Sequence, residues 1–133
     1  MAPLRLLIVD DHPAVREGLA NLLATEDDLL VVGEAENCKS SLDAAARLRP
    51  ELVLLDLSLP DGSGIDAAKK IRRLLPESRI LMMSVREAGA DAGRAKRAGI
   101  SAWITKHCSP QEILGAIRAV GALTVSTKER KAP

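Results

Sequence analysis

The segment from Leu52 to Ile65, LVLLDLSLPDGSGI, constrains the fold more than any other part of the chain. Its first four residues are apolar without a polar break, which is typical of a short strand buried on both faces of a sheet. Asp56 follows at once, and the residues after it have the composition of a tight turn. Gly62 and Gly64 allow the backbone to pass close to the end of the strand. The segment therefore predicts one acid at the carboxyl end of a buried central strand, beneath a tight loop.

Strands and helices alternate along the rest of the chain. Each apolar run is followed by a segment with helical spacing or with a helix-capping signal. The predicted strands are Leu4–Val9, Leu29–Glu34, Leu52–Leu55, Ile80–Met83 and Ala102–Thr105. The predicted helices begin at Pro13, span Lys39–Leu48, Ile65–Leu75 and Ala88–Ala98, and open again at Ser109 and Pro110.

Five strand–helix units in strict alternation imply a parallel sheet with helices on both faces. Right-handed crossovers leave few ways to wind such a sheet, and five units favour a flavodoxin-like α/β fold with strand order 2-1-3-4-5. We expect a single domain over residues 1–121. Residues 122–133 lose the apolar periodicity and gain charge, so they are expected to form a tail or the start of a linker. The fourth helix is expected to be the weakest, because its apolar residues are all alanine and it contains two glycines.

Composition excludes several classes of protein. Hydrophobic residues make up 47% of the 133-residue chain, which argues against disorder. The 19 Lys and Arg nearly balance the 18 Asp and Glu, so bulk charge gives no reason to expect binding to nucleic acid or to a membrane. There is no apolar run of membrane-spanning length and no signal-peptide pattern. Cys38 and Cys108 lack metal-ligand spacing, so we interpret them as reduced thiols of a cytoplasmic protein.

Polar side chains stand at the predicted strand ends. Asp10 and Asp11 follow the first strand, and Asp56 follows the third. Ser84 closes the fourth strand and Lys106 follows the fifth. In a doubly wound sheet, ligands bind beyond the carboxyl ends of the strands, at the point where the strand order reverses. The order 2-1-3-4-5 therefore brings three carboxylates, a hydroxyl and an ammonium group to one crevice.

This set of groups suits phosphoryl transfer to a carboxylate. Two like unit charges ~4 Å apart repel by about 4 kcal/mol at an effective dielectric of 20, and a divalent cation would relieve that repulsion. All-oxygen ligands favour Mg²⁺ or Mn²⁺ over Zn²⁺. Beside such an ion, an aspartate can act as a nucleophile and form an aspartyl-phosphate. The ion and a lysine neutralise charge on the transferring group, to which a nearby hydroxyl can donate a hydrogen bond.

The same five residues resemble the signature of two-component response-regulator receiver domains. The resemblance extends from about Leu4 to Val120. The segments VDDHPAVREGL, LVLLDLSLPDGSGID and KRAGISAWITKHCSPQEIL are similar to the NarL/FixJ-like branch, whose receivers precede a helix-turn-helix DNA-binding domain. That output domain lies outside these residues, so we expect no nucleic-acid contact through this chain itself. The chain is expected to be either an excised receiver or a stand-alone one.

The resemblance implies roles for the residues around the acids. Asp56 would be the phosphoacceptor, and Lys106 would hold the phosphoryl group. Asp11 and Asp56 would bind Mg²⁺ directly, together with the backbone carbonyl of Ser58, and Asp10 would act through a metal-bound water. The neighbouring histidine, at position 12, is interpreted as a loop or cap residue instead of a ligand.

Three further residues take switch or access roles under the resemblance. Ser84 would be the switch hydroxyl, and Trp103 stands where the family has its switch aromatic residue. Arg86 occupies a position that is usually small in the family. Its guanidinium would narrow access to Asp56 or contact the phosphoryl group.

The implied function is a phosphorylation-dependent signalling switch. A sensor histidine kinase would phosphorylate Asp56 and so change the surface of the fourth helix, the fifth strand and the fifth helix, with a homodimer expected in the phosphorylated state. The protein would not be an enzyme in the usual sense, although it can catalyse its own phosphorylation and dephosphorylation. One alternative is a degenerate receiver that only binds partners. A remote alternative is an aspartyl-phosphate phosphatase, which usually has an Asp-x-Asp pattern where this chain has Asp10-Asp11-His12.

Overall fold

The computed structural model describes residues 2–131, with side chains described up to residue 123. Five parallel strands form one sheet in the order β2-β1-β3-β6-β7. These strands are β1 (Leu4–Val9), β2 (Leu29–Ala35), β3 (Leu52–Asp56), β6 (Arg79–Ser84) and β7 (Ile100–Thr105). The helices are α1 (Pro13–Ala24), α2 (Cys38–Leu48), α3 (Gly64–Leu74), α4 (Ala92–Arg97) and α5 (Pro110–Lys131). Because β6 and β7 are the fourth and fifth strands of this sheet, the predicted order 2-1-3-4-5 and the flavodoxin-like fold are confirmed.

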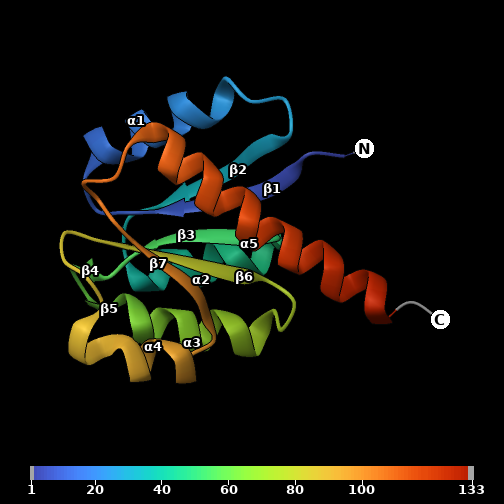
Figure 1. Cartoon of the computed structure of the whole chain (residues 1–133). Coiled ribbons are helices and arrows are strands. Elements are labelled where there is room, and N and C mark those ends of the chain that lie inside the picture. Colours follow the sequence, from blue (N-terminus) through green and yellow to red (C-terminus); the bar gives the residue numbers. More distant parts are fainter. Residues whose placement is uncertain (1, 132–133) are drawn as a thin grey trace.

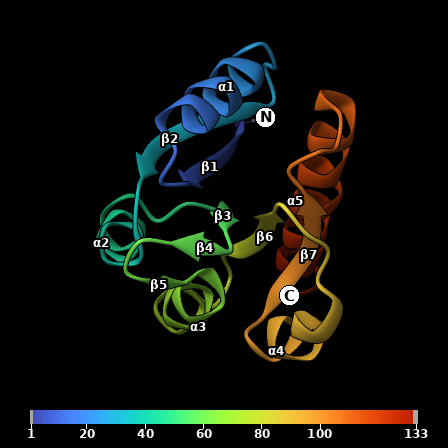
Figure 2. The same cartoon turned by 90° about the vertical axis from the view of Figure 1, so that its left-hand side faces the viewer.

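The sheet lies between two layers of helices, with α1 and α5 on one face and α2, α3 and α4 on the other (Figures 1 and 2). Successive residues of each central strand face opposite layers. Leu7, Val53 and Met82 pack in the cluster under α2 and α3, whereas Leu6 and Leu54 pack in the cluster under α1 and α5. All five residues are at most 1% exposed to solvent. This two-sided burial explains why the strands read as unbroken apolar runs.

Local signals place each helix start close to a strand end. Asn37 caps α2 by accepting a hydrogen bond from the backbone N–H of Ser40. Ser109 and Glu112 form a capping box at the start of α5, with side-chain to backbone distances of 3.1 Å in both directions. The resulting short connections leave the carboxyl ends of the strands open at one edge of the sheet.

A small hairpin follows β3 and was not predicted. Its strands, β4 (Ser58–Leu59) and β5 (Gly62–Ser63), pair antiparallel. The turn residue Asp61 accepts hydrogen bonds from the backbone N–H groups of Cys38 and Lys39 at the start of α2. The loop above the central strand is therefore fixed to a neighbouring helix.

Two helix lengths differ from the prediction. The segment Ala88–Ala98 was expected to be one helix, but α4 begins only at Ala92, after a 3-10 helix at Gly89–Asp91. Gly89 has a φ of +46°, which lies outside the right-handed helical region. At the other end, α5 continues to Lys131, into the residues from 122 onward that were expected to form a tail or linker. Residues 122–131 contain no proline, which would have stopped the helix.

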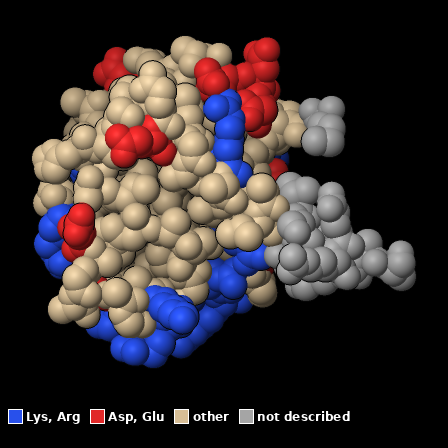
Figure 3. Space-filling model, viewed as in Figure 1, with Lys and Arg blue, Asp and Glu red and all other residues tan. Residues whose placement is uncertain are grey.

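Charge is segregated on the surface although its sum is only +1. Lys and Arg gather over α3 and α4 at the lower edge of the molecule in Figure 3, whereas Asp and Glu lie mainly at the opposite edge. The groove between α3 and α4 is lined by Lys69, Arg72, Arg73 and Arg97. Within the described residues, no helix combines the length and the apolar character that crossing a membrane requires.

Candidate functional site

The predicted site residues meet at the carboxyl edge of the sheet, which faces the viewer in Figure 2. Asp56 and Ser84 are the last residues of β3 and β6, while Asp10 and Lys106 directly follow β1 and β7. The backbone N–H of Lys106 donates to the carbonyl of Ser84 at 2.7 Å, so the last two strands remain paired to their ends. The structure therefore brings together the groups that the sequence places at separate strand ends.

The ammonium group of Lys106 bridges two buried carboxylates. Its Nζ lies 2.7 Å from Asp10 Oδ2 and 3.2 Å from Asp56 Oδ2. The side chains of Asp10 and Asp56 are 3% and 7% exposed. Leaving either acid without a partner at that depth would be costly, so Lys106 is the principal cation of the site among the described residues.

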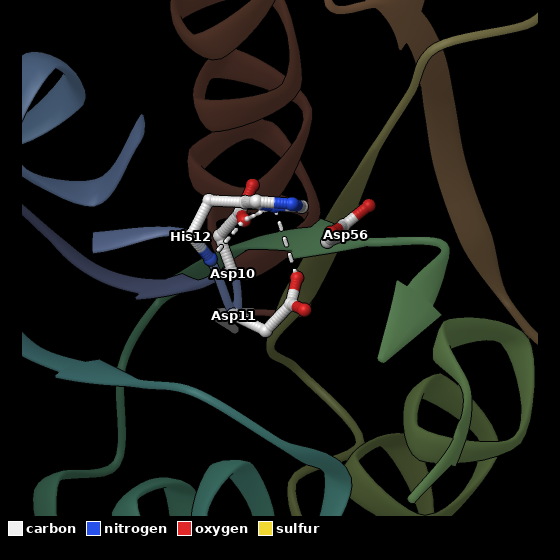
Figure 4. A group of neighbouring side chains, drawn as sticks. All are labelled: Asp10, Asp11, His12 and Asp56. Carbon is white, nitrogen blue, oxygen red and sulfur yellow. Dashed lines mark hydrogen bonds and ion pairs between the residues drawn. The ribbon is translucent and has the colours of Figure 1, made fainter. Parts of the chain in front are cut away.

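Asp11 and His12 complete the acidic cluster (Figure 4). His12 Nδ1 lies 3.0 Å from Asp10 Oδ1 and 3.1 Å from Asp11 Oδ1. His12 does precede α1 as its N-cap, but its side chain makes no capping hydrogen bond. The interpretation of His12 as a cap or loop residue is therefore incomplete, because its ring contacts two of the three acids.

Burial and neighbouring charges shift the pKa values of Asp10 and Asp56 in opposite directions. Burial tends to raise the pKa of Asp10, but hydrogen bonds from Lys106 and His12 outweigh it and hold that pKa below its usual value. Burial and the charge of Asp10 raise the pKa of Asp56, which Lys106 offsets only in part. Burial lowers the pKa of Lys106, but its bond to Asp10 and the charge of Asp56 more than reverse this and keep the amine protonated.

These shifts predict that Asp56→Asn stabilises the metal-free protein at neutral pH. A carboxyl whose pKa is raised on folding costs stability once pH exceeds its unfolded pKa of about 3.9, and asparagine removes that cost. At lower pH the native carboxyl is protonated in both states, so the difference between the two proteins should vanish. Urea unfolding between pH 3 and pH 7 with a chelator present would measure this. Equal stabilities at pH 7 would contradict the raised pKa.

The donor set fits a hard divalent cation. Ligand atoms of Asp10, Asp11, His12 and Asp56 all lie within 4.8 Å of one another. Asp11 Oδ1 is shielded from solvent and has the His12 ring 3.1 Å away but no well-formed hydrogen bond, so this buried oxygen has capacity for a ligand. Carboxylate oxygens are the ligands preferred by Mg²⁺ and Mn²⁺. The acidic cluster is therefore compatible with Mg²⁺.

The backbone of Arg86 connects Ser84 to Trp103. The N–H of Arg86 donates to Ser84 Oγ at 3.2 Å, and its carbonyl accepts from the indole Nε1 of Trp103 at 3.0 Å. The side chain of Ser84 is buried at the strand end. A movement of the Ser84 hydroxyl would therefore change the hydrogen bond to Arg86, and Arg86 in turn accepts the hydrogen bond of the indole.

The Arg86 side chain has a different contact from those expected. Its Nη2 lies 2.5 Å from Asp91 Oδ2, and the side chain is 57% exposed. Arg86 and Asp91 line a groove of about 360 Å³ beside the β4–β5 hairpin, together with Ser58 and Arg94. The guanidinium is therefore engaged at the rim of the site and not with the carboxylate of Asp56.

Arg16 also joins the site, and the sequence did not single it out. Its Nη1 donates to the backbone carbonyl of Asp10 at 2.5 Å, and its Nε lies 3.3 Å from Glu34 Oε1. The available signal was a cation about one helical turn after the two acids, on the helix that follows them. Its link to Glu34 depends on the register between β1 and β2, which the predicted strand order does not give.

Comparisons with known proteins found matches over most of the chain. The profile of the response regulator receiver domain matches residues 6–118. Response regulator protein VraR of Staphylococcus saprophyticus is 34% identical over 116 residues, which cover 87% of this chain and 56% of that protein. The chain thus spans about half the length of the curated relatives it matches.

Two solved structures are similar in both sequence and fold. A LuxR-family two-component response regulator from Aurantimonas sp. SI85-9A1 has a TM-score of 0.86 and 36% identity, covering 91% of this chain and 86% of the other. The signal receiver domain of the response regulator NarL from Mycobacterium tuberculosis has a TM-score of 0.86 and 28% identity, covering 92% and 98%.

Proposed function

The chain belongs to the response regulator receiver domain family, and on that premise we propose that Asp56 accepts a phosphoryl group from a sensor histidine kinase. Receiver domains are signalling components of two-component systems and not classical enzymes. The observation that carries the proposal is the Lys106 ammonium between the buried carboxylates of Asp10 and Asp56. This arrangement places a cation beside the oxygen that would attack.

The transfer follows from the chemistry of these groups. An oxygen of the Asp56 carboxylate attacks phosphorus, a P–O bond forms, and the P–N bond of the donor phosphohistidine breaks with its electron pair leaving on the imidazole. Lys106 shifts from Asp56 to a phosphoryl oxygen and keeps its bond to Asp10. Asp11, Asp56 and the Ser58 carbonyl would hold Mg²⁺, with Asp10 acting through water. When bound, this ion would neutralise negative charge on the transferring group. The same site would hydrolyse the acyl phosphate by admitting water.

The switch proposal extends the same site to the surface. The Ser84 hydroxyl turns toward the phosphoryl group and releases the Arg86 N–H. Because the Arg86 carbonyl also holds the indole of Trp103, the change passes to β7 and to the surface formed with α4 and α5. This is a local charge event that biases an element with two arrangements.

The wider role is also part of the proposal. Residues 1–121 would act as the receiver, and residues 122–133 would lead toward a DNA-binding output domain in a cytoplasmic transcription regulator. A phosphorylated homodimer would be the active form. A receiver that only binds partners is the second candidate.

Arg86→Ala is expected to change the rate of phosphorylation or of dephosphorylation, because Arg86 lines the groove beside the phosphoacceptor loop. Removing its side chain breaks the ion pair with Asp91 and frees the loop after Ser84. Phosphoryl incorporation and its decay, followed by mass spectrometry, would measure both rates. Unchanged values for both would remove Arg86 from the site.

The proposed function is tested by mixing the protein with Mg²⁺ and a small-molecule phosphodonor, then counting phosphoryl groups by intact mass. One group per chain is expected, dependent on Mg²⁺ and absent in Asp56→Asn. Asp66→Asn, which alters an exposed acid of α3, is the matched control and should behave as the native protein. Incorporation that survives Asp56→Asn would reject Asp56 as the acceptor. No incorporation at all would favour the partner-binding candidate.

A further inference from the structure

Arg16 occupies an unusual position for a helix arginine. It lies in α1, yet its side chain is only 17% exposed and turns back toward the loop between β1 and α1. Nη1 donates to the backbone carbonyl of Asp10 at 2.5 Å, and the Arg16 N–H donates to the carbonyl of His12 at 3.1 Å. The side chain and the backbone of Arg16 therefore hold the two ends of the loop from Asp10 to His12.

The second anchor lies on the neighbouring strand. Arg16 Nε is 3.3 Å from Glu34 Oε1, near the end of β2. In the sheet Ile8 pairs with Glu34, and the Asp10 N–H donates to the carbonyl of Ala35 at 3.1 Å. Arg16 thus ties the end of β1 to the end of β2 on the side away from Lys106.

The bond to Asp10 has a geometric consequence for both loop acids. The Asp10 carbonyl belongs to the planar peptide unit that joins Asp10 to Asp11. Holding the direction of this carbonyl holds that plane, and this restricts the directions in which the two side chains leave the backbone. Because Glu34 balances the charge of Arg16, the effect on the acids is one of orientation and not of added positive charge.

We propose that Arg16 is a positioning residue that orients the Asp10–Asp11 peptide and thereby sets the affinity of the acidic cluster for a divalent cation. The inference rests on the proposed function, in which these acids hold such a cation. Residues that orient metal ligands through hydrogen bonds typically contribute about 10- to 100-fold to metal affinity. Arg16 is suited to this role because its bond goes to the ligand-bearing backbone and not to a carboxylate oxygen that would hold the cation.

The test is a Mn²⁺ titration of the whole chain, with free Mn²⁺ measured by electron paramagnetic resonance. We expect Arg16→Gln to bind Mn²⁺ about tenfold more weakly than the native protein. Arg16→Lys keeps the charge but lacks the planar group that reaches both partners. Its loss of Mn²⁺ affinity should therefore be smaller than that of Arg16→Gln, but still measurable. Urea unfolding without metal reports the stability of each variant separately.

Arg118→Gln is the matched control. Arg118 also joins two elements, through Glu26 at 2.6 Å and Asp28 at 2.8 Å, but these acids lie at the opposite end of β2. Removing the Arg118 side chain should lower stability and leave Mn²⁺ affinity unchanged.

Native Mn²⁺ affinity in folded Arg16→Gln, or equal losses of affinity in Arg16→Gln and Arg118→Gln, would overturn the positioning role. If Arg16→Gln does not fold, native affinity in Arg16→Lys would overturn it. A native protein that binds no Mn²⁺ would overturn the acidic site itself, and this inference with it.

Discussion

Gly64→Ala is expected to destabilise the protein by about 3 kcal/mol or more, near the upper end of overpacking costs. An ideal Cβ at Gly64 would lie 2.1 Å from the carbonyl oxygen of Asp56 and 3.0 Å from the Cα of Leu57. Both are backbone atoms, so no change of rotamer can relieve the clash. The carbonyl in question belongs to the proposed phosphoacceptor, so the rate of phosphorylation should fall as well.

Urea unfolding with and without the substitution measures the stability change. Gly18→Ala in α1 is the control, because an added Cβ there meets no atom within 4 Å. Alanine is the better helix former by about 1 kcal/mol, so this variant should be as stable as the native protein or more so. Comparable stabilities for Gly64→Ala and Gly18→Ala would show that the loop after β3 is not closely packed on Asp56.

Lys106→Met is expected to cost about 3 kcal/mol of stability in the absence of divalent cations. The ammonium is the principal partner of two acids that are 3% and 7% exposed, and removing one member of a buried ion pair leaves uncompensated charge. Mg²⁺ should reverse much of this loss, because a cation among the carboxylates replaces the missing charge. Urea unfolding with a chelator and with saturating Mg²⁺ would measure both effects.

Two comparisons sharpen the Lys106 prediction. Lys69→Met removes an exposed lysine of α3 and should change stability little in either buffer. The stabilisation by Mg²⁺ should be larger in Lys106→Met than in the native protein, because the ammonium group no longer competes with the ion for the carboxylates. A Mg²⁺ effect that is smaller in Lys106→Met would contradict the placement of the ion among these acids.

The positions of the site residues could be predicted from the sequence because the sheet is parallel. Asp10, Asp56, Ser84 and Lys106 are far apart in the chain, but each stands at the end of an apolar run, and parallel strands end at one edge. Strand identity and winding order were therefore enough to bring these groups together. Their roles in phosphoryl transfer remain a proposal.

Side-chain directions could not be obtained in the same way. Arg86 pairs with Asp91, five residues later, which lies in a 3-10 helix at Gly89–Asp91 where alanine content suggested a regular helix. The ring of His12 turns to two acids instead of capping α1. Arg16 reaches Glu34 across strands that are distant in sequence. Each contact depends on backbone geometry that periodicity does not encode.

The fluorescence of Trp103, the single tryptophan of the chain, tests most directly whether phosphorylation of Asp56 is coupled to a surface change. The indole bonds to the backbone that also holds the Ser84 hydroxyl, so it should report both events at the site. We predict a saturable change on adding Mg²⁺ and a second change on adding a small phosphodonor. In Asp56→Asn the second change should be lost, and the first should need more Mg²⁺, because Asp56 is one of the proposed ligands. No response to Mg²⁺, or a second change that persists in Asp56→Asn, would contradict a switch driven by Asp56.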